Sequence, residues 1–275
     1  SFDININVEE TSTGEFSLGG GYSSGNGTQA TIGVSENNLF GKGQKLNLYF
    51  LTSERQNRAD FSFTEPFYLN RDVSLTTDIF TTVKEYRESY YDNETDGFGL
   101  GLGYNTGEYG RQSISYSLES RSIIAYSEAS TSVKSEAGDN ILSILSFNHR
   151  VDKTNNRLDP SDGWYTSNQI GLAGIGGDKK YLKLGASAAS FRKILDEKLI
   201  LSFVGKTGYI IGLNQNIEIS DRFILGDSSF VGFKNAGIGP RDVSTDQALG
   251  GNIYYTFTPE IKFDFSIDVV PINTG

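Results

Sequence analysis

Apolar and polar residues alternate in long runs over most of the chain. In residues 96–106, for example, Phe98, Leu100, Leu102 and Tyr104 alternate with glycines. Successive side chains point to opposite faces of a β-strand, so a period of two predicts strands with one apolar face and one polar or glycine-lined face. The pattern therefore predicts an all-β fold.

The runs are separated by Gly- and Asn-rich turns, which favour consecutive antiparallel hairpins. The thirteen predicted strands are 14–24, 28–36, 44–54, 58–64, 72–87, 96–106, 112–127, 139–152, 163–174, 179–192, 198–210, 247–258 and 260–270. Most reach the roughly 9 to 11 residues that a tilted strand needs to cross a membrane, whereas strands in soluble sheets usually have about 5 to 6. Strand length therefore favours a membrane barrel, although alternation alone also fits a soluble sandwich.

The connections between the runs differ in length. Compact connections are predicted at 37–43, 65–71, 107–111, 153–162 and 193–197, and longer, more polar ones at 88–95, 128–138 and 211–246. Short turns at one rim and long loops at the other are typical of outer-membrane barrels. Aromatic residues near strand ends would form an interfacial girdle: Tyr22, Phe40, Phe67, Tyr68, Tyr90, Tyr91, Tyr104, Tyr109, Trp164 and Tyr165.

The chain of 275 residues has a net charge of −10 and no cysteine. Its acidic balance argues against a nucleic-acid partner, because such proteins concentrate basic residues in a patch. The lack of cysteine excludes disulfides and thiolate metal sites. No apolar run approaches the roughly 18 to 20 residues of a membrane helix. The first residues show neither the basic nor the apolar segment of a signal peptide.

Residues 221–242 interrupt the alternation with a long, glycine-punctuated segment, DRFILGDSSFVGFKNAGIGPRD. Structureless segments longer than about 12 to 15 residues inside a compact domain are usually functional or disordered. This segment carries apolar residues that favour burial: Phe223, Ile224, Leu225, Phe230, Val231, Phe233 and Ile238. We therefore predict that it folds back into the interior.

The end of this segment, SSFVGFKNAGIGPRD, resembles the signature loop of the BamA-type outer-membrane assembly and translocation family. Four further stretches resemble the family in the same order: TGEFSLGGGYSS, ENNLFGKGQKLNL, FSFTEPFYLNRDVSL and RVDKTNNRLDPSDGWYTS. The resemblance implies a transmembrane antiparallel β-barrel of sixteen strands, of which about thirteen are present here. It also implies that the signature loop (residues 221–242) enters the barrel lumen.

The motif residues of the signature loop are Phe230, Val231, Gly232, Phe233, Gly239, Pro240, Arg241 and Asp242. The chain departs from the family pattern at Val231, where the family carries an arginine that is expected to dock on lumen carboxylates. Valine cannot form that ion pair, so Arg241 or Lys234 are the candidate replacements. Gly232 is expected to need either a special backbone conformation or a close contact.

The resemblance also divides the chain. Residues 1–10 are expected to be the last strand and linker of a periplasmic POTRA module, and residues 11–275 the barrel, which would lack its last three strands. On this expectation the chain is a fragment, and strand 14–24 has no closing partner within it.

Strand 14–24 is the expected lateral seam of the barrel, with the residues Phe16, Leu18, Gly19, Gly20, Gly21 and Tyr22. Three consecutive glycines weaken a strand because they supply no side-chain packing. One interpretation is that neighbouring strands need the space. The other is that a weak edge strand unzips and pairs with an incoming strand, a known mode of recognition, and the family resemblance implies this role.

The function implied is assembly and insertion of proteins in the bacterial outer membrane by strand templating at the lateral seam, without ATP or cofactor. The implied partners are outer-membrane lipid, unfolded outer-membrane protein clients, accessory lipoproteins of the assembly complex and periplasmic chaperones. The alternative is a protein translocation pore of the two-partner secretion or TamA type, which shares the signature loop. The number of POTRA modules upstream would discriminate between them.

Catalytic and metal chemistry have little support in the residues. The single histidine, His149, lies on a predicted strand with no nucleophile elbow nearby, so we expect no enzyme and place it in the lumen or at a rim. The polar residues at 92–96 include Asp92, Asn93, Glu94 and Asp96 but lack the ligand spacing of an EF-hand loop. We predict that they form a solvated outer loop.

Overall fold

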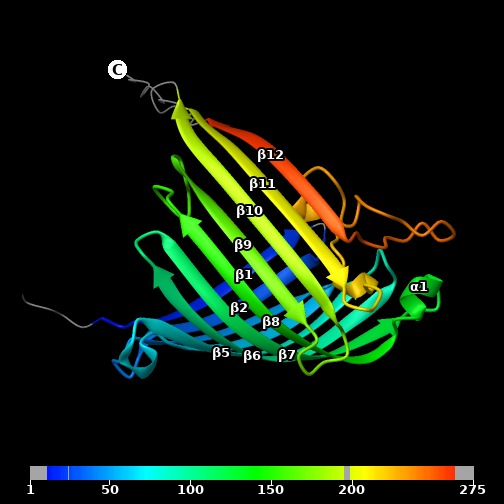
Figure 1. Cartoon of the computed structure of the whole chain (residues 1–275), viewed down its shortest axis with the longest axis horizontal. Helices are drawn as coiled ribbons and strands as arrows, with labels where there is room; N and C mark the ends of the chain where they lie inside the picture. The colour runs from blue at the N-terminus through cyan, green and yellow to red at the C-terminus, as the bar shows by residue number, and fades with distance from the viewer. Residues whose placement is uncertain (1–10, 24, 195–198, 264–275) are drawn as a thin grey trace, which may run out of the picture.

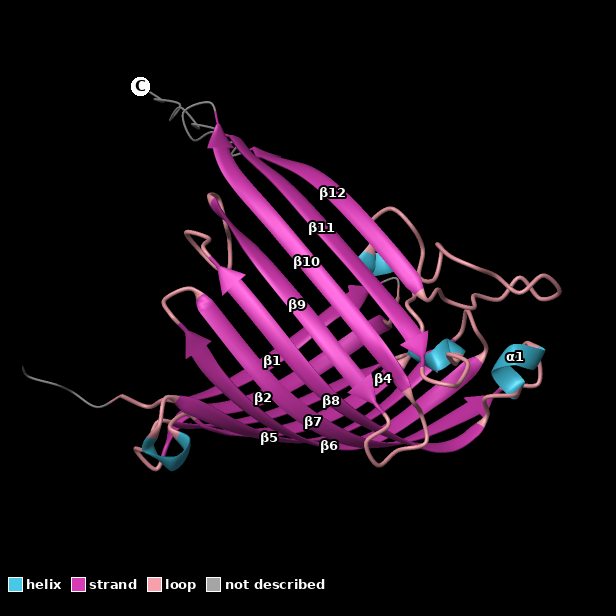
Figure 2. Cartoon of the chain, viewed as in Figure 1, coloured by secondary structure: helices cyan, strands magenta, loops and turns pink. Residues whose placement is uncertain are grey.

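A computed structural model describes residues 11–23, 25–194 and 199–263 of the chain. In that part, twelve antiparallel strands form one sheet in which sequence neighbours pair, and the sheet curves into an open barrel wall (Figures 1 and 2). The strands are β1 (Gly14–Ser23), β2 (Gly27–Leu39), β3 (Gln44–Ser53), β4 (Gln56–Glu65), β5 (Val73–Tyr86), β6 (Tyr91–Thr106), β7 (Gly110–Ala125), β8 (Gly138–Asp152), β9 (Gly163–Ala173), β10 (Tyr181–Ile194), β11 (Leu199–Gly212) and β12 (Ile253–Phe263).

The helical elements are short and lie in the connections. They are η1 (Tyr68–Asn70), α1 (Thr131–Lys134), η2 (Ile219–Asp221) and η3 (Asp227–Ser229). No helix within the described residues is long and apolar enough to cross a membrane.

β1 and β12 are the two edges of the described sheet. β1 pairs with β2 along its whole length, from Gly14 opposite Glu36 to Ser23 opposite Gly27. β12 pairs with β11. Within the described residues neither strand has a second strand neighbour. The expected POTRA strand at 1–10 and the end of the barrel beyond residue 263 lie outside the described residues.

The two faces of the sheet differ as the alternation predicts. On the outer face, Ile79, Phe98 and Leu118 lie side by side across β5, β6 and β7, and all three are exposed. On the inner face, Gly97 pairs with Glu119. A row of exposed apolar side chains on the convex face is the surface that an outer-membrane barrel presents to lipid. The all-β antiparallel prediction is therefore confirmed.

Most side chains of the predicted aromatic girdle are exposed, as a girdle requires, but two are not. Eight of the ten predicted side chains are exposed: Tyr22, Phe40, Phe67, Tyr68, Tyr90, Tyr104, Tyr109 and Trp164. Tyr91 is only 2% exposed, and it stacks on Tyr86 with ring centroids 4.7 Å apart. Tyr165 contacts Phe191 and carries Arg150 over its ring. Strand parity turns both tyrosines inward, so they cannot belong to a girdle on the outer face even though they lie near strand ends.

The antiparallel connections separate onto two rims. One, the short-turn rim, carries residues 40–43, 66–72, 107–109 and 153–162. The other, the loop rim, carries residues 54–55, 87–90, 126–137, 174–180 and 213–252. The predicted compact and long connections thus lie on opposite rims, except that 193–197 is only partly described.

One strand prediction and one loop prediction are wrong. The runs 247–258 and 260–270 are predicted as two strands, but a single strand, β12, begins at Ile253 and continues through Pro259 to Phe263. Residues 264–270 lie outside the described residues. Proline cannot donate to a ladder, but the pairing of β12 with β11 continues on both sides of Pro259. The outer loop predicted at 88–95 is instead a tight turn, since β6 begins at Tyr91 and pairs with β5 and β7 from there.

The buried apolar core lies at the loop rim and not along the middle of the wall. One cluster joins Tyr91, Ile123, Ala129, Val133 and Ile219. A second cluster joins another five residues: Leu142, Ala173, Tyr181, Ile210 and Ile217. Each cluster therefore contains one isoleucine from the β11–β12 connection. The start of this connection is packed against the wall by apolar burial, which is the largest favourable term in folding.

Candidate functional site

The candidate functional site is the β11–β12 connection, residues 213–252, together with the wall that it contacts. Two antiparallel bridges, Phe223 with Gly251 and Leu225 with Ile238, join the leg before the tip (residues 213–229) to the leg after it (residues 234–252). A third bridge, Arg241 with Ala248, closes a turn within the second leg. The guanidinium of Arg222 also donates to the carbonyl oxygens of Ile217 and Leu249, one on each leg. The connection therefore has a defined internal fold without being a regular element.

Asp221 anchors this connection to the inner face of the wall. Its carboxylate accepts hydrogen bonds from Arg121 Nη1 at 2.9 Å, Lys179 Nζ at 3.1 Å and the Tyr181 hydroxyl at 3.3 Å. The side chain of Asp221 is 3% exposed and that of Lys179 5%. A buried carboxylate with two cationic partners is the arrangement that offsets the cost of taking charge out of water.

Strand alternation positions Arg121 and Tyr181, whereas Lys179 lies in the connection just before β10. Arg121 is on β7 at the inward parity shared by Glu119, which pairs with its guanidinium at 2.8 Å. Lys183, two residues after Tyr181 on β10, donates from Nζ to the Asp221 carbonyl oxygen at 2.9 Å. Two cations thus meet the Asp221 carboxylate, and a third, Lys183, meets the backbone carbonyl oxygen of the same residue.

The connection is also tied to the neighbouring loops. Asn235 donates to the Glu88 carboxylate at 3.0 Å, and that carboxylate pairs with Arg55 at 3.2 Å. The buried Ser89 hydroxyl donates to the Ala248 carbonyl oxygen at 2.8 Å. Gln247 accepts from the Ser130 backbone N–H at 2.7 Å. These contacts bring the β5–β6 and β7–β8 connections together under the loop.

Glu136, which follows α1, makes a further tie. Both of its carboxylate oxygens accept from the backbone N–H of Ile219, at 2.8 and 2.9 Å. Burial raises the pKa of Glu136 above its ordinary value, and the neighbouring Glu218 acts in the same direction. The protonated form is therefore favoured more in the packed structure than in the unfolded chain.

The tip of the signature loop does not have the burial that its apolar residues predict. Val231 is 87% exposed and Phe233 49% exposed. The ring of Phe233 contacts Phe230, with centroids 5.5 Å apart, and not the wall. Burial is concentrated away from the tip, at Ile217, Ile219 and Asp221 before it and at Ala236, Gln247 and Ala248 after it. The prediction that Val231 and Phe233 are buried is wrong.

The motif residues have roles within the loop. Gly232 has a φ of +94°, and a Cβ there would meet open space, so backbone conformation and not crowding explains this glycine. Gly239 likewise has a φ of +125° with no close neighbour. Asp242 accepts hydrogen bonds from Ser244 and Thr245 in its own turn. The exposed Pro240 accepts at its carbonyl oxygen from the Leu249 N–H.

Neither candidate replacement for the family arginine reaches the wall. Arg241 donates to the carbonyl oxygens of Asp246 and Ala236, at 2.7 and 3.1 Å, and its nearest carboxylate is that of Asp246. Lys234 forms no ion pair with any described residue. The charge contact with the wall instead has the opposite polarity, a loop carboxylate at Asp221 on wall cations. Sequence reasoning missed Asp221 because its partners lie far along the chain, although Glu119 and Arg121 at the same strand parity as three serines of β7 were a detectable signal.

The predicted seam residues lie on β1 at the edge of the sheet. Phe16, Leu18 and Tyr22 are between 68 and 77% exposed on the outer face. A Cβ at Gly19 would crowd the Thr31 hydroxyl, 2.6 Å away. A Cβ at Gly20 or Gly21 would make only ordinary contacts, at 3.7 and 3.8 Å. Space therefore explains one of the three glycines and not the other two.

The remaining predicted polar residues are on strands. Asp92, Asn93, Glu94 and Asp96 belong to β6, so the prediction of an outer loop there is wrong; the ladder with β5 and β7 extends past the apolar part of the wall. Asp92 accepts from the Tyr126 hydroxyl at 2.6 Å. His149 is on β8 near the short-turn rim, with Nδ1 3.2 Å from the Gln112 amide nitrogen.

A curved antiparallel wall with a lipid-facing surface and a docked long loop defines an outer-membrane β-barrel protein. A model of the Omp85 superfamily domain matches residues 38–270, so the chain belongs to the Omp85 superfamily. The predicted resemblance to the BamA-type family is thereby confirmed. Its location in the bacterial outer membrane follows from this family and fold.

Relatives align over nearly the whole chain. The outer membrane protein assembly factor BamA of Neorickettsia risticii is 31% identical over 269 residues, which are 97% of this chain and 36% of that protein. BamA of Nitratidesulfovibrio vulgaris is 28% identical over 98% of this chain and 35% of its own length. A SAM50-like protein of Schizosaccharomyces pombe is 29% identical over 84% of this chain and 50% of its own. The chain thus spans about a third of the length of these BamA relatives.

Two solved structures share the fold. The crystal structure of BamA from Haemophilus ducreyi lacking POTRA domains 1-3 superposes with a TM-score of 0.81, at 21% identity, over 92% of this chain and 53% of that one. CdiB from Acinetobacter baumannii superposes with a TM-score of 0.57, at 13% identity, over 92% of this chain and 46% of that one. The wall described above is therefore that of a BamA-type barrel.

Proposed function

We propose that the protein containing this chain assembles and inserts other outer-membrane proteins by templating strands at the edge of β1. The signature loop would lie in the lumen of the closed barrel, with the long loops of the loop rim outside the cell. The process would need no ATP, cofactor or catalytic residue. Its partners would be outer-membrane lipid, unfolded client proteins, accessory lipoproteins and periplasmic chaperones, and no nucleic acid.

The observation that carries the proposal is the weakness of β1 where space does not require it. Each glycine in a strand costs about 0.5 to 1 kcal/mol relative to alanine, and only Gly19 is crowded. In lipid, an unpaired backbone group costs several kcal/mol. If β1 exchanges its partner strand for a client strand without leaving an edge unpaired, the energy barrier to insertion of the client is lower. A weak edge strand suits that exchange.

Site-specific crosslinking tests the proposal in the full-length protein. Leu18→Cys and Tyr22→Cys place thiols on the β1 edge, and Ile32→Cys is the matched control, since it lies opposite Leu18 on β2 with its side chain on the same face. A stalled client with a cysteine in its last strand should crosslink to the two β1 positions and not to Ile32→Cys. Equal crosslinking from all three positions would refute templating at β1.

The second candidate function is a translocation pore of the two-partner secretion or TamA type, for which the shared fold of CdiB is the supporting observation. In such a pore the client passes the loop inside the barrel. A cysteine at Val231, at the exposed loop tip, would then crosslink along the client chain while the β1 positions would not. The same experiment therefore separates the two functions.

A further inference from the structure

Carboxylates from two other segments lie against the turn that joins β1 to β2. On one side, Glu54 from the β3–β4 connection accepts a hydrogen bond from the Thr28 N–H at 3.0 Å, and this bond lowers the pKa of Glu54. A Cβ at Gly27, whose φ is +74°, would overlap that carboxylate. On the other side, the Asp227 carboxylate lies directly against Gly25.

Gly25 is glycine for a different reason from Gly20 and Gly21. Gly25 is buried, and a Cβ there would overlap the carboxylate of Asp227. Gly20 and Gly21 have room for a Cβ. The hairpin therefore combines a weakened strand with a turn shaped to receive a side chain of the signature loop.

The position of Asp227 depends on the fold of the signature loop. Its N–H donates to the Phe233 carbonyl oxygen at 2.8 Å. The preceding Gly226 has a φ of +135°, donates its N–H to Ser229 Oγ at 2.9 Å, and lies so close to the Lys234 carbonyl oxygen that a Cβ would overlap it. Six residues earlier in the chain is Asp221, the wall anchor. The same loop fold thus delivers one carboxylate to the wall and another to the seam hairpin.

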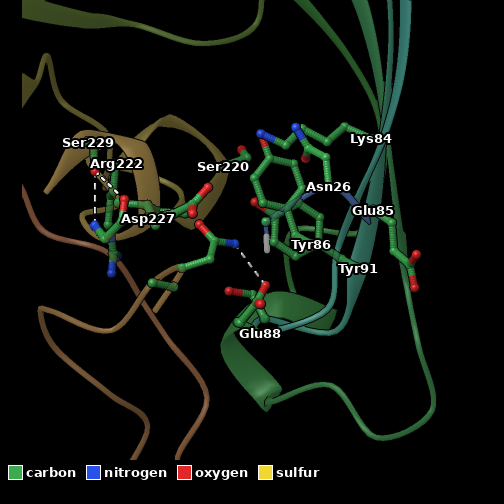
Figure 3. Close-up of a pocket in the computed structure, with 16 residues that line it drawn as sticks. Asn26, Lys84, Glu85, Tyr86, Glu88, Tyr91, Ser220, Arg222, Asp227 and Ser229 are labelled. Carbon is green, nitrogen blue, oxygen red and sulfur yellow. Dashed lines mark hydrogen bonds between the residues drawn. The ribbon is translucent and has the colours of Figure 1, made fainter. Parts of the chain in front are cut away.

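The hairpin turn, the loop and the β5–β6 turn enclose a cavity of about 300 Å³. In Figure 3, Asp227 and Asn26 face this cavity together with Glu88, whose carboxylate accepts from Asn235. Asn26 donates its backbone N–H to the Ser23 hydroxyl at the end of β1. The contact between Asp227 and Gly25 is therefore next to Asn26, whose hydrogen bond reaches the last residue of β1.

We infer that Asp227 is a positioning residue that couples docking of the signature loop to the order of β1. With the loop docked, the Asp227 carboxylate holds the end of the hairpin while the glycine run leaves the strand above it weak. When the loop leaves the wall, the hairpin turn loses one of its two clamps and β1 opens more often. That opening assists client insertion only if the proposed function is right.

Amide hydrogen exchange of residues 17–23 in the full-length protein in lipid bilayers tests the coupling, with β7 amides as the internal reference. Asp227→Ala should raise exchange in β1 by about tenfold and leave β7 unchanged, as local opening would. Gly25→Ala should do the same, because it displaces the carboxylate. The double variant should match either single variant, since both remove one contact.

Asp242→Ala is the matched control, because this carboxylate accepts only from its own turn, and it should leave β1 exchange unchanged. Parent-like exchange in Asp227→Ala, or additive effects in the double variant, would overturn the inference. If Asp227→Ala does not fold, Asp227→Asn takes its place with a smaller rise expected. A client-insertion assay on the same variants separates the two proposals: raised β1 exchange with normal insertion refutes the seam function and not the coupling.

Discussion

Replacing Asp221 with asparagine removes a charge from the point where the β11–β12 connection meets the wall. Asparagine has nearly the same size, so the change leaves packing with Ile219 and Tyr181 in place. The two cations lose their shared counter-ion, but neither is left alone. Arg121 retains Glu119 at 2.8 Å, and Lys179 retains Glu218 at 2.7 Å.

The magnitude follows from burial. Removing one member of a buried ion pair usually costs about 3 to 5 kcal/mol, and a hydrogen bond to a charged group contributes about 1.5 to 3 kcal/mol. Because each cation keeps a second carboxylate, we expect Asp221→Asn to weaken docking of the loop by only about 2 to 3 kcal/mol. That corresponds to docking weakened by roughly 30- to 150-fold.

Amide exchange at Phe223 in the full-length protein in bilayers measures this docking. Its N–H donates to the Gly251 carbonyl oxygen at 2.9 Å in the bridge beside the anchor, and it should be protected only while the legs stay together on the wall. Asp221→Asn should speed its exchange by the factor above, whereas Asp242→Asn should leave it unchanged. Slow, parent-like exchange in Asp221→Asn would refute the anchoring role.

Three further outcomes are expected. Gly226→Ala should disrupt the loop by several kcal/mol because its Cβ overlaps a carbonyl oxygen, whereas Gly232→Ala should cost about 1 kcal/mol for its backbone conformation alone; proteolysis of the loop compares them. Since burial raises the pKa of Glu136, the contact of Glu136 with Ile219 should be most stable below about pH 4.5 and should weaken as the pH rises. Glu136→Gln should flatten this pH dependence, measured by amide exchange of the loop. Ile79→Lys on the lipid face should impair folding into bilayers by about 2 to 4 kcal/mol, and inward Ser115→Lys by little, measured by heat-modifiable gel mobility.

The strands could be predicted from the sequence because their signal is local. A period of two requires only neighbouring residues, and it located the eleven strands before residue 211 and the single connection that carries the signature loop. The same local reasoning failed where pairing decided the outcome. β6 extends through polar residues from Tyr91 because its neighbours continue the ladder there, and β12 passes through Pro259 because pairing with β11 continues on both sides of it.

The docking of the loop could not be predicted, because it depends on which distant residues the curved wall brings together. Asp221 meets Arg121, 100 residues earlier in the chain, and Lys179, 42 residues earlier. Neither composition nor periodicity predicts which distant residues form such pairs. The motif at the tip includes Val231, which is exposed, whereas the buried ion pairs are made by Asp221 on the leg before it. Strand parity turned Arg121 on β7 and Tyr181 on β10 inward, and the β9–β10 connection supplied Lys179, but only the curvature of the wall brought the three residues around one carboxylate.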